Sequence, residues 1–368
     1  MRAAALIVLA SCAVSARDTT PPPPDAGQPD DDASGGGGVP DGAPAACTPQ
    51  PIGGLTPEQW YWVPVSGSAC GNGSSAGFAI NTTTKSKEVV IFLMGGGGCY
   101  SAETCSGPQP TAANLNGYTA STAAQELGMF QAGSIFDRNA ASNPLRDATF
   151  VFVPYCTGDF HSGNTVAAYG THHVGYANIS AYLAMLAPAY CDASRIVLTG
   201  SSAGGFGTLF NYEHVQEAFP QTPIDLVDDS GPPLRQVVTQ QNQLRAAWGQ
   251  VANLPADCIG CDQAWHNFLP YLTAKHPAQR FSLISSLQDY SIGTFFGFTP
   301  STYQAAINDL ADNVIAPLAN LRVYYIANND HVWLNRNLAS ISTSGTTLAT
   351  FLQNELDHTS PFTNIRPP

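Results

Sequence analysis

The chain is poor in charge. Only 11% of its 368 residues are Asp, Glu, Lys or Arg, and 14 basic residues stand against 27 acidic ones. The formal net charge is −13, so the chain has no excess of basic residues of the kind that nucleic-acid binding requires. An acidic protein also does not favour polyanionic substrates. Low charge together with 34 glycines indicates a loop-rich extracellular protein, and we expect no nucleic-acid partner.

The chain also lacks an apolar run long enough to cross a membrane as a mature helix. A short apolar run follows Arg2, as in a secretory signal, and ends at Cys12. Residues 9–12, Leu-Ala-Ser-Cys, are similar to a bacterial lipoprotein box, in which the cysteine is lipidated. The alternative is an ordinary signal peptide with a chance cysteine. We expect a signal segment over 1–12, export, and membrane contact only through a lipid anchor at Cys12.

Residues 13–46 are rich in Pro, Gly and Asp and cannot build a hydrophobic core. This composition predicts a disordered tether, and it places the catalytic domain at 47–368.

Eight cysteines remain after Cys12, and an even number in an exported chain indicates disulfides. The close pairs Cys99 with Cys105 and Cys258 with Cys261 are plausible, and the other pairings stay open. We expect Cys156 not to pair with Cys191, because one follows a strand and the other precedes one. A zinc site at 258–261 is discounted because no second close ligand pair is present.

Apolar runs alternate with helical stretches along the chain. They predict two early antiparallel strands at 60–65 and 77–81 and a helix at 176–186. Buried strands are expected at 89–94, 149–154, 195–199, 224–228 and 322–327. Continuous apolar strands are typical of a parallel sheet covered by helices on both faces. Residues 235–320 have a mostly helical pattern, which predicts a helical cap region.

The most informative motif is residues 200–204, Gly-Ser-Ser-Ala-Gly, which fits the G-x-S-x-G pattern of a nucleophile elbow. The motif follows an apolar strand and precedes a helical pattern, as an elbow requires. Small residues on both sides allow the chain to double back and expose the hydroxyl of Ser202. The alternative is a glycine-rich turn with an idle serine.

A serine nucleophile needs a base and an acid, which in α/β-hydrolases follow it in the order acid, then histidine. His331 is the best base because it comes shortly after the strand expected at 322–327. His214, His266, His276 and His358 are the other histidines after the elbow, and His358 is expected to be solvated in a polar tail. The position of the acid is open on these grounds, with Asp228, Asp229 and Asp289 as candidates and Asp330 badly placed.

Four consecutive glycines at 95–98 follow the strand expected at 89–94. Such a loop lets a substrate carbonyl approach backbone N–H groups and is found at the oxyanion holes of lipases and esterases. A phosphate cradle is disfavoured because no Lys-Ser/Thr follows the glycines, and a plain turn is the remaining alternative. Ala203, directly after the nucleophile, would supply a second donor.

Three segments carry a family resemblance. They are residues 92–100 (Phe-Leu-Met-Gly-Gly-Gly-Gly-Cys-Tyr), 153–159 (Val-Pro-Tyr-Cys-Thr-Gly-Asp) and 200–205. Together they resemble the pectin acetylesterase family, which includes the Notum-type carboxylesterases, in consistent order from about residue 58 to 340. The chain departs from the family at Met94 and Gly98, where an acidic residue and an aromatic are usual.

The resemblance implies an α/β-hydrolase fold and hydrolysis of carboxylic esters without metal or cofactor. It assigns Ser202 as nucleophile, Asp289 as acid and His331 as base. It also assigns Gly97, Gly98 and Ala203 as oxyanion donors. The histidines at 161, 172 and 173 receive no role from it.

The sequence therefore predicts a monomeric serine carboxylesterase that acts on acetyl or other short acyl esters of a glycan or another acylated molecule. The alternative is a surface binding or adhesion protein on an idle hydrolase fold. The presence of all three triad residues favours the enzyme.

Overall fold

The computed structural model describes residues 47–368. The predicted signal segment, Cys12 and the tether at 13–46 lie outside the described residues. None of the helices in the described part is both long and apolar enough to cross a membrane.

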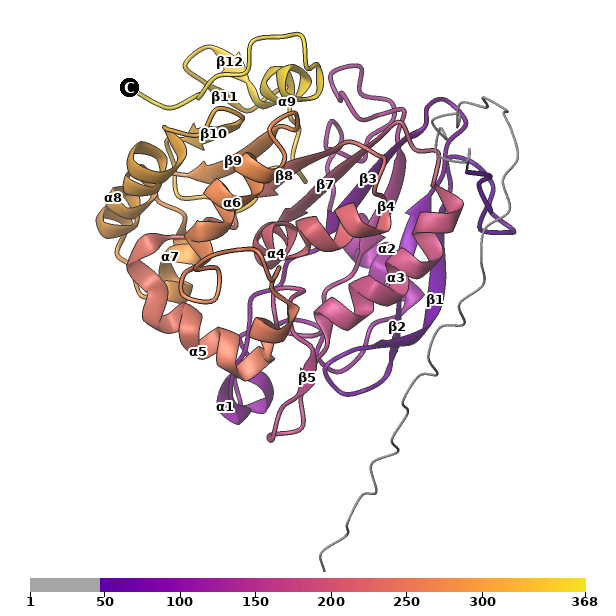
Figure 1. The fold of residues 1–368 in the computed structure, drawn as a ribbon, viewed down its shortest axis with the longest axis horizontal. Coiled ribbons are helices and arrows are strands. Elements are labelled where there is room, and N and C mark those ends of the chain that lie inside the picture. The colour runs from indigo at the N-terminus through magenta and orange to yellow at the C-terminus, as the bar shows by residue number, and fades with distance from the viewer. Residues whose placement is uncertain (1–46) are drawn as a thin grey trace, which may run out of the picture. The chain divides into compact units, whose positions relative to one another are not determined.

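One eight-stranded sheet organises the described residues (Figure 1). Its order is β1-β2-β4-β3-β7-β8-β9-β10, with antiparallel pairing of β1 to β2 and β2 to β4 and parallel pairing elsewhere. The strands are β1 Trp60–Ala69, β2 Ser75–Asn81, β3 Glu88–Leu93, β4 Thr149–Val153, β7 Arg195–Ser201, β8 Ile224–Asp229, β9 Phe281–Ser286 and β10 Leu321–Ile326. The predicted mostly parallel sheet is confirmed, as is the antiparallel pair at its start.

Helices pack on both faces of the sheet, and Figure 1 shows α3, α4 and α6 over one face. The α-helices are α1 Ala102–Ser106, α2 Ala120–Leu127, α3 Gly175–Ala189, α4 Ala203–Ala218, α5 Val238–Trp248, α6 Phe268–Lys275, α7 Tyr290–Phe296, α8 Pro300–Leu310 and α9 Leu348–Leu356. Two short hairpins, β5 Thr165–Val166 with β6 His172–His173 and β11 Ser342–Thr343 with β12 Thr346–Thr347, lie outside the main sheet.

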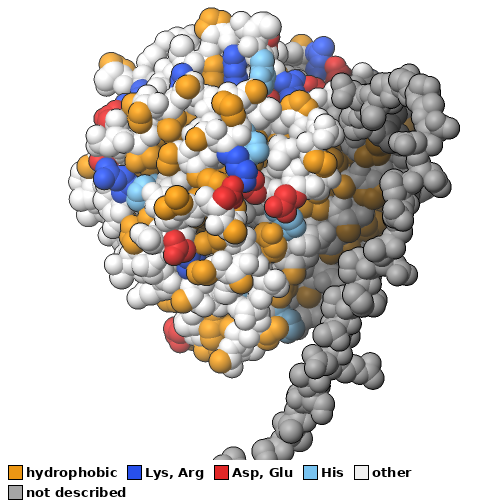
Figure 2. All heavy atoms as spheres, in the orientation of Figure 1, with side chains coloured by type: hydrophobic (Ala, Val, Ile, Leu, Met, Phe, Trp, Pro, Cys, Tyr) orange, Lys and Arg blue, Asp and Glu red, His pale blue; other side chains and the backbone are white. Residues whose placement is uncertain are grey.

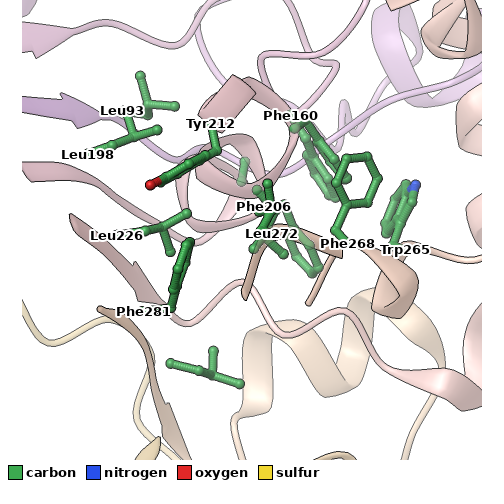
Figure 3. Packing of buried hydrophobic residues seen from close by; sticks show 14 of the residues in the cluster. Leu93, Phe160, Leu198, Phe206, Tyr212, Leu226, Trp265, Phe268, Leu272 and Phe281 are labelled. Carbon is green, nitrogen blue, oxygen red and sulfur yellow. The ribbon is translucent and has the colours of Figure 1, made fainter. Parts of the chain in front are cut away.

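The sheet separates two hydrophobic cores, and neighbouring residues of one strand belong to different cores. In β3, Ile91 and Leu93 enter the core under α3 and α4, whereas Val90 and Phe92 enter the core under α2 and α9. This alternation follows from the two-residue period of a strand. Figure 3 shows the first core, where Leu93, Leu198, Leu226 and Phe281 of successive strands pack toward Phe206 and Tyr212 of α4.

The cap region differs from the sequence prediction. Residues 235–320 were expected to be mostly helical, but they contain β9, which pairs with both β8 and β10. Ser282, Ser285 and Ser286 interrupt its apolar pattern, although all three are buried. The hydroxyls of Ser285 and Ser286 are hydrogen-bonded, which allows polar residues to occupy a central strand.

The cysteines of the described residues form four disulfides. Cys99 pairs with Cys105 and Cys258 with Cys261, as predicted. Cys47 pairs with Cys191, and Cys70 pairs with Cys156. The prediction that Cys156 and Cys191 do not pair is confirmed.

Charged side chains are few and mixed in sign on the face seen in Figure 2, without a continuous basic patch. Most Lys and Arg residues pair with nearby carboxylates, such as Lys275 with Glu213 and Asp257. This distribution fits the low and acidic charge of the sequence.

Candidate active site

A sharp turn joins β7 to α4 at the predicted elbow. Ser202 has φ 60° and ψ −120°, a backbone conformation that residues other than glycine rarely adopt. A Cβ on Gly200 would lie 2.5 Å from the carbonyl oxygen of Gly204, and one on Gly204 would lie 1.9 Å from that of Leu93. Both glycines of the motif are therefore required by close backbone packing.

The two serines of the elbow have different environments. Ser201 is buried, and its hydroxyl donates to Asp229 Oδ2 at 2.7 Å. Ser202 is partly exposed, and its hydroxyl has no hydrogen-bond partner within residues 47–368. Ser202 is therefore the serine that is free to react.

His331 follows β10, and its ring is held by Asp289. The distance from His331 Nδ1 to Asp289 Oδ2 is 2.7 Å. The Asp289 side chain is fully buried, and its other oxygen accepts the N–H of Ile292 at 2.9 Å as the N-cap of α7. These contacts leave Nε2 of His331 without a partner among residues 47–368, in the cavity that Ser202 also lines.

The other candidates for base and acid lie elsewhere. His214 stacks on Tyr176 and contacts Ser180, while His276 pairs with Glu213. His358 was expected to be solvated, and it is exposed, although its Nε2 also lies 2.9 Å from Asp225 Oδ2. His266 is separate from the cavity, and Asp330 binds Arg336 instead of the His331 ring.

Residues of the glycine run line the same cavity as Ser202. Gly95, Gly96 and Gly97 line this cavity with Ala203. The N–H groups of Gly96, Gly97 and Ala203 have no partner within residues 47–368, whereas the N–H of Gly98 donates to the carbonyl of Thr111 at 3.1 Å. Gly98 was predicted to be an oxyanion donor, but its N–H is occupied by this hydrogen bond.

Several hydrogen bonds hold the glycine loop in this orientation. Ala113 N donates to the Gly96 carbonyl at 2.8 Å, which turns the N–H of the same peptide unit, that of Gly97, the opposite way. The hydroxyl of Tyr155 donates to the Gly97 carbonyl at 2.7 Å. His161 Nε2 donates to the Met94 carbonyl at 2.8 Å, and burial lowers the pKa of His161 so that the ring stays neutral. The sequence offered no sign of these roles.

The remaining histidines without a predicted role are structural. His173 Nδ1 donates to the carbonyl of Thr157 at 2.8 Å, and Nε2 is 2.8 Å from the hydroxyl of Tyr169. His172 forms part of β6 and packs beside Gly73. Neither residue lines the cavity at Ser202.

Asp228 and Asp229, the rejected candidates for the acid, end β8. Burial raises the pKa of Asp228 well above its ordinary value, and its Oδ1 accepts the N–H of Gly231 at 2.7 Å. Burial also raises the pKa of Asp229, against the opposing effect of its hydrogen bonds with Leu334, Trp333 and Ser201. Asp229 Oδ2 accepts from Trp333 N at 2.8 Å and Leu334 N at 3.0 Å.

Five adjacent parallel strands supply the site. The loops that leave β3, β7, β9 and β10 carry the glycine run, Ser202, Asp289 and His331 in that order, and Asp229 is the last residue of β8. Because all five strands point the same way, these loops meet at one edge of the sheet, where open α/β sheets place their sites.

The cavity at this edge has a volume of about 340 Å³. Its polar end is formed by Ser202, His331 and the glycine loop. The rest is mostly apolar, with Ser291 and Asn335 as its polar residues, and is lined by Phe92, Met94, Met129, Phe130, Phe160, Ile292, Phe295 and Val332. No Lys, Arg, Asp or Glu of the described residues lines it, so the cavity suits an uncharged apolar group beside the reacting centre.

A second cleft of about 410 Å³ adjoins the first and shares Ser291 and Phe295 with it. Its lining also comes from Tyr100, Thr104, Thr111, Gln240, Gln243, Leu244, Tyr290, Thr294 and Phe296. Tyr290 is 67% exposed and Tyr100 41% exposed, which is high for such large aromatic residues. This lining combines aromatic faces with amides and hydroxyls and contains no charge.

One group of the described residues has the composition of a metal site. It consists of Cys99, Cys105 and His173. The two sulfurs form a disulfide and cannot act as thiolate ligands, so this group does not fit a metal. The expectation of a reaction without metal or cofactor stays a prediction.

The sheet order, the strained elbow and the five strand ends define an α/β-hydrolase fold. The solved structure of the Wnt deacylase Notum from Drosophila superposes with a TM-score of 0.63, covering 83% of this chain and 95% of that chain at 20% sequence identity. The family model "Pectinacetylesterase" matches residues 63–271, which is more than half of the chain. The chain belongs to the pectinacetylesterase family.

Individual relatives carry Notum names. The palmitoleoyl-protein carboxylesterase notum2 of Xenopus laevis is 33% identical over 166 residues, covering 44% of this chain and 33% of that protein. The human palmitoleoyl-protein carboxylesterase NOTUM is 29% identical over 175 residues, covering 44% of this chain and 34% of that protein. The match therefore spans about a third of the length of these relatives. The family-model match contains Ser202 and the glycine run but ends before Asp289 and His331.

Proposed function

We propose that this protein is a serine carboxylesterase with Ser202, His331 and Asp289 as its triad. The observation that carries the proposal is the elbow: Ser202, with positive φ and a free hydroxyl, shares one cavity with His331. The 2.7 Å contact from His331 to Asp289 completes the arrangement. Membership of a family of esterases supports the same reaction.

In the proposed reaction Ser202 Oγ attacks the ester carbonyl carbon while His331 Nε2 takes the hydroxyl proton. The charge that develops on the carbonyl oxygen is stabilised by the N–H groups of Gly96, Gly97 and Ala203. His331 then gives the proton to the leaving alcohol, and an acyl-enzyme remains on Ser202. Water attacks this acyl-enzyme with His331 as base again, which releases the acid and restores the serine.

The acyl group is acetyl or another short acyl group, and it occupies the apolar cavity. Each additional buried methylene contributes about 0.8 kcal/mol, or roughly fourfold in kcat/KM, while the cavity has room. We therefore expect p-nitrophenyl butyrate to be hydrolysed faster than the acetate. A series from acetate to decanoate, measured as kcat/KM, finds the chain length at which the cavity is full.

The alcohol part of the substrate is a glycan or another acylated molecule without charge. The second cleft supports this choice, since aromatic faces such as Tyr290 pack on apolar ring surfaces while Gln240 and Gln243 can hydrogen-bond hydroxyls. No basic residue lines the cleft to pair with the carboxylates of an acidic polysaccharide. We expect an acetylated neutral glycan to be deacetylated faster than acetylated pectin.

A fluorophosphonate probe tests the triad directly, because it reacts with activated serines. The full chain is expected to be labelled at Ser202 and to hydrolyse p-nitrophenyl esters. Ser202→Ala should lose both properties, while Ser201→Ala, which keeps the nucleophile, should still be labelled. An unlabelled wild-type protein would favour the alternative, a binding protein on an idle hydrolase fold.

Export and anchoring at Cys12 form a separate part of the proposal. Four disulfides in the described residues support an oxidising compartment. If Cys12 is lipidated, the protein labels with palmitate and partitions into detergent, and Cys12→Ser abolishes both. Recovery of soluble protein with an unmodified N-terminus beyond Cys12 would refute the anchor without affecting the esterase.

A further inference from the structure

Asp229 lies between the elbow and the loop that carries His331. Its side chain is completely buried at the end of β8. On one side its carbonyl oxygen accepts Ser202 N at 2.7 Å, and its Oδ2 accepts the Ser201 hydroxyl at 2.7 Å. On the other side the same Oδ2 accepts the N–H groups of Trp333 and Leu334. One residue therefore bonds to both halves of the proposed reaction centre.

The loop that carries His331 has a strained backbone at the residue after His331. Val332, between His331 and Trp333, has φ 58°, which is an outlier for a β-branched residue. Such a conformation costs on the order of 1–3 kcal/mol and persists only where the surroundings enforce it. The two N–H groups that follow Val332 both bind Asp229, so this carboxylate enforces the turn that presents His331.

We propose that Asp229 is a positioning residue that holds the His331 loop against the nucleophile elbow. The inference rests on the proposed function and extends it beyond the triad. Asp229 acts through backbone and Ser201 contacts, and Asp289 remains the residue that binds the His331 ring.

The hydrogen bonds of Asp229 match this role. Oδ2 accepts three donors, and Oδ1 accepts the Ser230 hydroxyl at 3.0 Å. Replacement of Asp229 by alanine would leave the N–H groups of Trp333 and Leu334 buried without hydrogen-bond partners, which is costly. The loop that carries His331 would therefore shift to a position where these N–H groups bind other acceptors.

The neighbouring Asp228 provides a matched control. It is also buried at the end of β8, and it also accepts a backbone N–H, that of Gly231. It makes no hydrogen bond to the elbow serines or to the His331 loop. Loss of Asp228 removes a buried carboxylate from the same strand end without releasing the base.

The experiment compares Asp229→Ala, Asp229→Asn and Asp228→Ala in the full chain. Hydrolysis of p-nitrophenyl butyrate is measured well below each variant's melting temperature and expressed per active site, counted by endpoint fluorophosphonate labelling. Asp229→Ala is expected to lower kcat about 10- to 100-fold with KM changed less than about threefold, the scale of a misplacement near 1 Å. Asp229→Asn, whose amide oxygen still accepts the loop N–H groups, should recover part of that loss.

Each outcome bears on the proposal. A melting temperature that falls in both alanine variants, with kcat per site reduced only in Asp229→Ala, supports a positioning role. Equal kcat per site in Asp229→Ala and Asp228→Ala would overturn it, because the effect would be structural.

A further variant keeps the test decisive if Asp229→Ala does not fold. Ser201→Ala then removes the contact on the elbow side alone, and kcat is expected to fall a few-fold; an unchanged value for Ser201→Ala and Asp229→Asn would overturn the proposal. A wild-type protein without hydrolysis or labelling would instead overturn the proposed function itself.

Discussion

Tyr155 offers a sharp test of the oxyanion hole, because its hydroxyl touches the glycine loop but not the triad. The hydroxyl donates to the Gly97 carbonyl at 2.7 Å and accepts the Phe160 N–H at 3.0 Å. Burial raises the pKa of Tyr155 well above its ordinary value, so the group remains a donor throughout the working pH range. Tyr155→Phe removes one oxygen atom and leaves the buried ring in place.

The expected effects follow from those two bonds. The buried N–H of Phe160 and the Gly97 carbonyl lose their partner, which costs about 1–3 kcal/mol of unfolding free energy for each unsatisfied group. Complete loss of an oxyanion donor costs about 10²–10³ in kcat. Since Ala113 still holds the adjoining peptide unit, we expect a smaller loss for Tyr155→Phe, about tenfold in kcat.

The assay is steady-state hydrolysis of p-nitrophenyl butyrate, with urea unfolding in parallel. Tyr212→Phe is the control, because that buried hydroxyl also donates to a backbone carbonyl, that of Ile224 at 2.7 Å, away from the cavity. Both variants should lose stability, and only Tyr155→Phe should lose kcat. Equal kcat in the two variants would refute the argument that the Tyr155 bond orients the oxyanion loop.

Three other predictions concern the acid, the elbow and pH. Asp289→Asn should lower kcat by about 10³–10⁴ because an amide stabilises the wrong tautomer of His331; Asp330→Asn should not, and comparable kcat values in the two variants would exclude Asp289 as the acid. Gly204→Ala places a Cβ 1.9 Å from a backbone oxygen and should prevent soluble expression, whereas Gly53→Ala meets nothing within 4 Å and should express normally. Burial lowers the pKa of His214 to about 4. Between about pH 6.5 and 4, the unfolded chain therefore binds a proton at His214 that the folded chain does not bind. As the pH decreases through this window, the free energy of unfolding decreases by an amount on the order of 2–3 kcal/mol. Urea unfolding of His214→Gln at pH 7 and pH 4.5 should show a smaller loss than wild type, and an equal loss would contradict this prediction.

The sequence predicts most of the sheet because its strands are uninterrupted apolar runs. It does not predict β9, because three serines interrupt its apolar pattern and the partners of Ser285 and Ser286 come from elsewhere in the folded chain. Because β9 is not predicted, the position of residues in the sequence does not identify which aspartate is the acid. With β9 unrecognised, Asp289 could not be placed after a strand end, and only the family resemblance selected it over Asp228 and Asp229.

The oxyanion donors show a similar limit. Four glycines in a row predict a loop that exposes backbone, but they do not say which N–H groups remain free. The N–H of Gly98 is occupied by the carbonyl of Thr111, which comes later in the chain. The contacts of Tyr155, His161 and Asp229 are likewise long-range, and no local pattern in the sequence marks them.

Because the ends of five adjacent strands build the site, the order of synthesis matters. The glycine run and the elbow leave the ribosome first, and the strand that carries His331 comes late in the chain. Domains generally fold as units. On the proposed triad, Ser202 therefore has no base until β10 joins the edge of the sheet and brings His331 to the site. Appearance of esterase activity during synthesis or refolding would accordingly report completion of the sheet.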